Sequence, residues 1–62
     1  MNTIDISVEK ILVPAHQVIT EELCCWEVTV ETNCYGAKGI KIFRKCSKTE
    51  IDKIKKGYIW AE

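Results

Sequence analysis

The beginning of the chain alternates between apolar and polar side chains. The apolar positions before the single proline are Ile4, Ile6, Val8, Ile11 and Val13. The first three are spaced by two residues, which is the period of a strand with one buried face. The other two have the opposite parity, so we expect either a β-bulge near residues 9–10 or burial on both faces. Pro14 cannot donate a backbone hydrogen bond and is predicted to end the strand.

The segment from Ala15 to Leu23 permits two interpretations. Val18, Ile19 and Leu23 fit one face of a short helix, whereas residues 17–20 could equally be extended. We take the helix as the prediction and keep the extended form as its alternative.

The clearest pattern is that of a β-hairpin. Residues 24–33 and 39–46 alternate strongly on either side of a polar loop that contains glycine. With a three-residue tip at 35–37, the expected cross-strand pairs are Glu27 with Lys45, Thr29 with Phe43, Val30 with Ile42 and Glu31 with Lys41. This register brings opposite charges together on one face and gathers apolar side chains on the other. The apolar set consists of Trp26, Val28, Val30, Ile40 and Ile42.

After the hairpin the sequence predicts a helix and a last strand. Ser47 and Glu50 have the spacing of a capping box, which predicts a helix over about 48–56. The apolar residues on its narrow face are Ile51 and Ile54. Residues 58–60 are typical of a short closing strand.

Together these elements predict one small α+β domain over residues 1–62. We expect a single-layer antiparallel sheet of three or four strands, with the hairpin of residues 24–33 and 39–46 at its centre, one C-terminal helix and a short last strand. A chain of 62 residues has room for one core. Its apolar fraction of 47% is ordinary for a globular protein, so we expect it to fold.

Charge is balanced overall but unevenly distributed. Nine basic residues match nine acidic ones, which removes the usual argument for nucleic acid from net charge. Residues 1–37 contain one lysine and six acidic residues, whereas residues 38–62 contain eight basic and three acidic residues. Pairing between the hairpin strands accounts for part of this order. The rest leaves a basic C-terminal half that could contact phosphates.

The N-terminal residues bear on the cellular compartment. They lack the basic start and the continuous apolar stretch of a signal peptide, and no apolar run approaches the roughly 20 residues needed to span a bilayer. We therefore expect a cytoplasmic protein whose cysteines are reduced.

The cysteines and the single histidine are the candidate metal ligands. They are Cys24, Cys25, Cys34, Cys46 and His16. Structural zinc sites usually present paired ligands two to four residues apart, and neighbouring residues in a strand point to opposite faces. We therefore predict no metal and no cofactor, and we expect the thiols to act as small apolar side chains. A disulfide between Cys24 and Cys46, which lie diagonally in the expected register, stays open as an alternative, as does metal binding.

No feature of the sequence indicates catalysis. Paired catalytic carboxylates, a glycine-rich phosphate loop and a metal-binding helix motif are all missing from the sequence. His16 could activate a cysteine as a nucleophile, but no pattern places it beside one. A chain this small also has little volume for a pocket in addition to its core. We predict that the protein is not an enzyme.

The candidate partner-binding residues lie in and after the hairpin. They are Tyr35, Lys41, Phe43, Arg44, Lys45 and Lys48. The expected register leaves Phe43 on the polar face, where a large apolar side chain needs either cover from a neighbouring segment or a binding partner.

Two hypotheses for function follow. The first is a non-enzymatic protein-binding module, for example an inhibitor or regulator of a larger protein, which docks through the face around Phe43 or an unpaired strand edge; edge-to-edge self-association is its simplest version. In size and composition the chain is similar to many small proteins of phages and mobile elements that bind host proteins, an analogy that supplies no residues. The second is a nucleic-acid-binding module that uses the basic C-terminal half, with Phe43 and Tyr35 stacking on bases.

Overall fold

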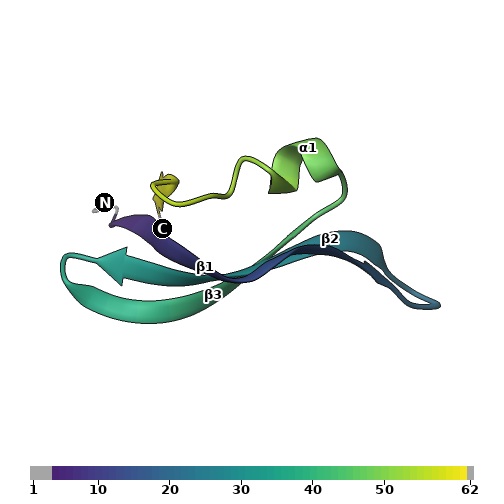
Figure 1. The fold of residues 1–62 in the computed structure, drawn as a ribbon, viewed down its shortest axis with the longest axis horizontal. Helices are drawn as coiled ribbons and strands as arrows, with labels where there is room; N and C mark the ends of the chain where they lie inside the picture. The colour runs from purple at the N-terminus through teal and green to yellow at the C-terminus, as the bar shows by residue number, and fades with distance from the viewer. Residues whose placement is uncertain (1–3, 62) are drawn as a thin grey trace.

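The computed structural model describes residues 4–61, which form a curled four-stranded antiparallel sheet and one short helix (Figure 1). The elements are β1 (Asp5–Ile19), β2 (Cys24–Cys34), β3 (Ala37–Lys45), α1 (Lys48–Ile51) and β4 (Ile59–Ala61). The strands are arranged in the order β3-β2-β1-β4. The antiparallel sheet and the β2–β3 hairpin are therefore confirmed, but the hairpin lies at one side of the sheet and not at its centre, because β3 is a terminal strand. No helix within residues 4–61 is long and apolar enough to cross a membrane.

Strand β1 continues through the proline that was expected to end it, so the predicted helix over residues 15–23 is wrong. Its register with β2 shifts between Val8 and Lys10, again between Ile11 and Val13, and again before His16. The first shift confirms the bulge expected near residues 9–10. Pro14 lies within the last shift, where the strand is already irregular and a missing N–H group interrupts no ladder bond.

A tight turn joins β1 to β2. The backbone N–H of Thr20 donates to the carbonyl oxygen of Leu23 at 2.7 Å, and the N–H of Leu23 donates to the Thr20 hydroxyl at 3.0 Å. Glu21 and Glu22 form the tip. The hydroxyl of Thr20 satisfies backbone groups of the turn, so the segment forms the end of a long hairpin and leaves no room for a helix.

The turn between β2 and β3 is one residue shorter than expected, which makes the predicted register wrong. Tyr35 and Gly36 alone form the loop, with φ angles of 51° and 89°, as a two-residue turn of type I′ requires. Cys34 pairs with Ala37, and every later pair shifts accordingly. A shift of one residue turns every side chain of β3 to the opposite face.

Helix α1 begins as predicted but is much shorter. The backbone N–H of Glu50 donates to the Ser47 hydroxyl at 3.2 Å, which is the expected N-terminal cap. The helix ends at Ile51 after four residues, and the backbone then turns toward β1. There the N–H of Val8 donates to the carbonyl oxygen of Tyr58 at 2.9 Å, while the N–H of Gly57 donates to the carbonyl oxygen of Val8 at 3.0 Å. These bonds extend the β1–β4 pairing, so the backbone in this region bonds to β1 and the helix does not continue.

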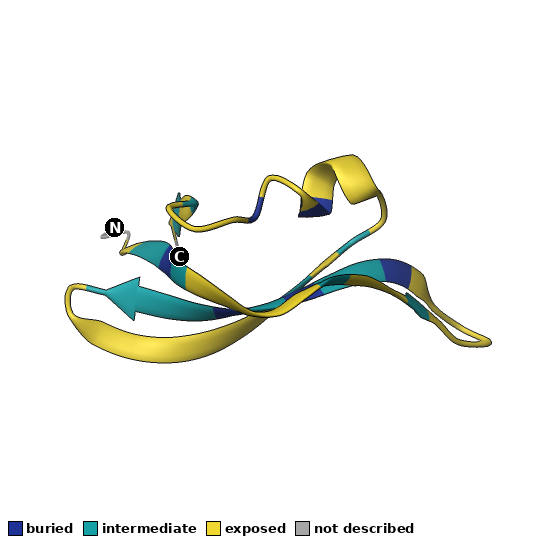
Figure 2. Ribbon diagram, in the orientation of Figure 1, coloured by how far each residue is buried: buried dark blue, intermediate teal, exposed yellow. Residues whose placement is uncertain are grey.

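The core lies between the sheet and the segment that runs from α1 to β4, and we call the side of the sheet facing this segment the inner face. The buried apolar side chains are Val8, Val28, Val30, Ile51 and Ile54. Figure 1 shows α1 and the following segment on one side of the sheet, and Figure 2 shows the buried positions concentrated where the two meet.

Three aromatic rings close the core at its edge. The ring of Phe43 lies with its centroid 4.9 Å from that of Trp60 and 6.2 Å from that of Tyr58, both in edge-to-face geometry. Phe43 belongs to β3 and Trp60 to β4, the two terminal strands of the sheet. Their contact shows that the sheet curls far enough for its two terminal strands to meet across the inner face.

Candidate functional site

Phe43 was predicted to lie on the binding face, but in the structure it packs against the core. It pairs with Val28 and packs against the buried cluster together with Trp60. The prediction that it lies among Thr29 and other polar side chains is wrong, because that prediction depended on the three-residue loop. Phe43 is thus half-buried by the chain itself.

The same shift places two isoleucines on the opposite side of the sheet, which we call the outer face. Ile40 and Ile42 pair with Glu31 and Thr29. Their exposed fractions are 72% and 47%. Val13 of β1 also pairs with Thr29 and is 43% exposed. The helix and the following segment lie on the inner face, so these apolar side chains have no cover within residues 4–61.

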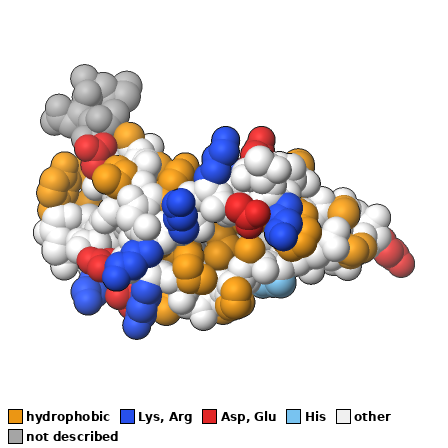
Figure 3. Space-filling view, turned by 45° about the horizontal axis from the view of Figure 1, so that its top comes forward, with side chains coloured by type: hydrophobic (Ala, Val, Ile, Leu, Met, Phe, Trp, Pro, Cys, Tyr) orange, Lys and Arg blue, Asp and Glu red, His pale blue; other side chains and the backbone are white. Residues whose placement is uncertain are grey.

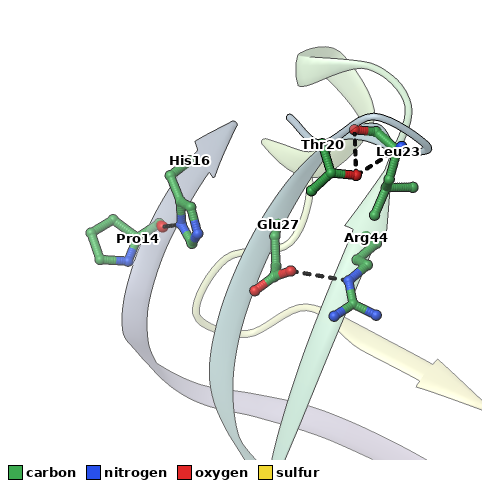
Figure 4. Close-up of polar contacts among 6 residues, drawn as sticks. All are labelled: Pro14, His16, Thr20, Leu23, Glu27 and Arg44. Carbon is green, nitrogen blue, oxygen red and sulfur yellow. Dashed lines mark hydrogen bonds and ion pairs between the residues drawn. The ribbon is translucent and has the colours of Figure 1, made fainter. Parts of the chain in front are cut away.

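Ion pairs flank the exposed isoleucines along the outer face. Arg44 Nε donates to Glu27 Oε2 at 3.0 Å, and Lys38 Nζ lies 3.8 Å from Glu31 Oε1. The expected partners of these two glutamates were Lys45 and Lys41. Figure 4 shows Glu27 on the middle strand, directed toward Arg44 on one side, with His16 on the strand at its other side. His16 pairs with Glu27 in the strand register and donates from Nδ1 to the Pro14 carbonyl oxygen at 2.9 Å.

The other predicted basic residues lie near aromatic rings of the core. Lys41 Nζ is 5.8 Å from the centroid of Phe43, and Lys48 Nζ is 5.9 Å from that of Trp26. Lys45 pairs with Trp26 in the β2–β3 register. The predicted site is therefore divided: Arg44 lies on the outer face, whereas these three lysines border the core.

Tyr35 is separated from the rest of the predicted set. It occupies the β2–β3 turn, and 83% of its surface is exposed. It borders a shallow depression with a volume of about 330 Å³. The residues around this depression are Asp5, Ile6, Ser7, Asn33, Tyr35, Gly36 and Ile59. The ionisable side chains in this set are one carboxylate and one phenol.

The four cysteines form no disulfide with one another. All four are free thiols: Cys25 is buried, Cys34 is half-buried, and Cys24 and Cys46 are exposed. Within residues 4–61 no group of three or more His, Cys, Asp or Glu side chains is arranged to hold a metal ion.

The sheet has two long edges that differ in regularity. Strand β4 pairs with Asp5, Ile6 and Ser7 of β1. Within residues 4–61, the rest of β1 has a neighbouring strand on one side alone, which is β2. That part of β1 contains the bulges and Pro14. Strand β3 is the other terminal strand; it pairs with β2 over its whole length without a register shift. Figure 2 shows β3 exposed along most of that length.

Sequence reasoning missed Ile40 and Ile42 as surface residues because it assigned them to the core. The signal that could have found them is the dipeptide Tyr35-Gly36. Glycine at the second loop position suits a two-residue turn of type I′, and adopting that loop exposes both isoleucines. Figure 3, in which the α1 side of the molecule is turned forward, shows that hydrophobic side chains are also visible there among lysine, arginine and carboxylate side chains.

Comparison with known proteins gives no relative from which a role could be transferred. No protein-family model matches the chain, and no similar curated protein or solved structure was found.

Proposed function

We propose that this chain is a non-enzymatic protein-binding module, such as an inhibitor or regulator of a larger cytoplasmic protein, and that it docks through the outer face around Ile40 and Ile42. The observation that carries the proposal is the exposure of two neighbouring isoleucines on an edge strand, on a face that the rest of residues 4–61 leaves uncovered. A lone exposed apolar side chain is normal, but a group of them on one open face indicates an interaction surface.

The composition of the outer face supports this proposal. Val13, Ile40 and Ile42 provide an apolar centre, while the Glu27–Arg44 and Glu31–Lys38 pairs lie beside it. An apolar centre with a polar rim is the usual arrangement of a protein–protein interface.

The nucleic-acid alternative loses one of its two proposed stacking residues. Phe43 is half-buried and its ring contacts those of Trp60 and Tyr58, so it is less accessible to a base than the expected register implied. No other observation favours this alternative, and it becomes an outcome of the test.

The test is photo-crosslinking and affinity capture from a lysate of the native host, with and without nuclease. The double variant Ile40→Thr/Ile42→Thr keeps β-propensity and backbone donors but removes the apolar surface. We expect it to lose at least about tenfold of the captured protein. The matched control is Ile59→Thr, since Ile59 is an isoleucine on β4 whose exposure lies between those of Ile40 and Ile42. Capture that is unchanged in the double variant, or that disappears with nuclease, would refute the proposal.

A further inference from the structure

The free edge of β3 presents a regular row of backbone hydrogen-bonding groups. In a two-residue hairpin the residues that flank the loop exchange both of their hydrogen bonds, and the bonding then alternates along the strands. Cys34 and Ala37 flank the loop here. The residues whose N–H and C=O groups point away from β2 are therefore Lys38, Ile40, Ile42 and Arg44. These groups form an edge to which another strand can add.

The two edges of the sheet are not equivalent templates. Pro14 and the bulges disrupt the free part of β1, and such irregularities discourage strand addition. Strand β3 has no proline and no bulge over Ala37–Lys45. An added strand therefore fits β3 better than β1.

Charge decides which kind of strand fits this edge. Residues 37–49 contain five basic residues and no acidic one, although Lys38 and Arg44 each pair with a glutamate of β2. In a symmetric antiparallel dimer of β3 strands, the lysines and arginine of one copy would lie beside those of the other. Like charges on neighbouring strands are destabilising, and edge lysines are a known protection against self-pairing. A second copy is thus disfavoured, whereas an acidic strand is complementary.

We propose that the partner supplies an extended acidic segment that pairs with β3 as an additional strand. This inference rests on the proposed protein-binding function and names the chemistry of the partner. On the outer face the segment presents apolar side chains opposite Ile40 and Ile42, flanked by carboxylates opposite Lys38 and Arg44. On the inner face it presents carboxylates near the lysines that border the core. Backbone hydrogen bonds supply affinity, and the alternate side chains supply selectivity.

A peptide designed to pair with β3 residue by residue tests the inference without any variant of the protein. In antiparallel pairing the complementary octapeptide is Glu-Glu-Val-Val-Glu-Ile-Thr-Glu, acetylated and amidated at its ends to remove terminal charges. The matched control replaces each glutamate with lysine. Binding to the full chain is followed by ¹⁵N–¹H NMR titration and by protection of amide protons from exchange. We expect the acidic peptide to bind at least about tenfold more tightly and to protect the outward amides of β3.

Substitutions at one exposed position separate backbone pairing from side-chain contact. Ile40→Pro removes an outward N–H from β3, which an edge strand tolerates at that position. Ile40→Thr changes the side chain and keeps the N–H. We expect the proline variant to weaken binding of the acidic peptide by about tenfold or more, and the threonine variant by about threefold or less. Equal effects of the two variants would overturn strand addition.

The remaining outcomes distinguish this inference from the proposed function. If neither peptide perturbs β3 while lysate capture still depends on Ile40 and Ile42, the strand model fails and the protein-binding function stands. Concentration-dependent dimerisation through β3, measured by sedimentation without peptide, overturns the charge argument. Binding of a thymidine 20-mer that protects the same amides overturns the assignment of a protein strand.

Discussion

On the inner face of the sheet Val28 and Val30 are fully buried, whereas on the outer face of the same hairpin Ile40 and Ile42 remain exposed. Both faces carry β-branched side chains that suit a strand. The difference lies in the segment from α1 to β4, which covers the inner face alone (Figure 1). The free energy of burial is therefore gained on one face, and the apolar side chains of the other contribute little to folding.

This asymmetry separates stability from binding. Residues on the inner face should respond to substitution through unfolding, and residues on the outer face through affinity. Four measurements test this separation.

The largest effect is expected at the buried contact between helix and sheet. Ile51 is among the largest fully buried side chains, so Ile51→Ala should lower the free energy of unfolding by about 3 kcal/mol. Ile59→Ala, at an exposed isoleucine, should change it by less than about 0.5 kcal/mol. Urea unfolding followed by tryptophan fluorescence measures both. Similar values for the two would show that α1 does not cover the core.

A smaller loss of stability is expected at Phe43, which sequence reasoning had placed in an interface. Phe43→Ala removes the edge-to-face contacts with Tyr58 and Trp60 and should cost about 2 kcal/mol in the free protein. Near-ultraviolet circular dichroism should show the loss of the aromatic cluster. An unchanged unfolding midpoint would contradict the packing of Phe43 in the core.

The β2–β3 turn determines which β3 side chains lie on which face of the sheet. Substituting its glycine should lower the free energy of unfolding by about 1 kcal/mol. Gly36 has a φ of 89°, and a Cβ built there meets no atom within 4 Å. Gly36→Ala therefore costs the conformational penalty alone, about 1 kcal/mol. Tyr35→Asn provides the opposite test, because Asn tolerates the left-handed conformation better, and it should stabilise by a few tenths of a kcal/mol. Thermal unfolding should show a lower midpoint for Gly36→Ala and a higher midpoint for Tyr35→Asn.

The smallest effect is expected for the ion pair on the outer face. Arg44 is more than half exposed, so its interaction with Glu27 should contribute about 0.5 kcal/mol or less, and less still at high salt. A double-mutant cycle with Arg44→Gln and Glu27→Gln isolates this energy. A coupling above about 1 kcal/mol would mean that the outer face also stabilises the fold.

Much of the secondary structure could be predicted because its signals are local. The alternation from Ile4 to Val8, the bulge after it and the hydroxyl cap at Ser47 each depend on a few neighbouring residues. The length of α1 could not be predicted in this way. A helix of nine residues is marginal by itself, and just after the segment expected to be helical Gly57 and Tyr58 bond to Val8 of β1 instead.

The register of the hairpin could not be fixed because β3 satisfies two alternatives. Its apolar side chains occupy both parities, with Phe43 on one and two isoleucines on the other. Its basic side chains do the same, so that Glu27 finds a cation in either register: Lys45 in the predicted one and Arg44 in the structure. Charge complementarity therefore could not discriminate between them. The register follows from the positive φ angles at Tyr35 and Gly36. The glycine is consistent with a two-residue turn of type I′, but a tyrosine at the first loop position does not predict a positive φ.

Ile6 pairs with Trp60, and these two residues lie near opposite ends of the described chain. The β2–β3 hairpin can close early because its strands are adjacent, but β4 can dock only after β1 and the segment from α1 are in place. Such distant pairings slow folding to the range of about milliseconds to seconds. In any conformation in which β4 is not docked, the buried cluster lacks the cover of Trp60, and both faces of the sheet expose apolar side chains.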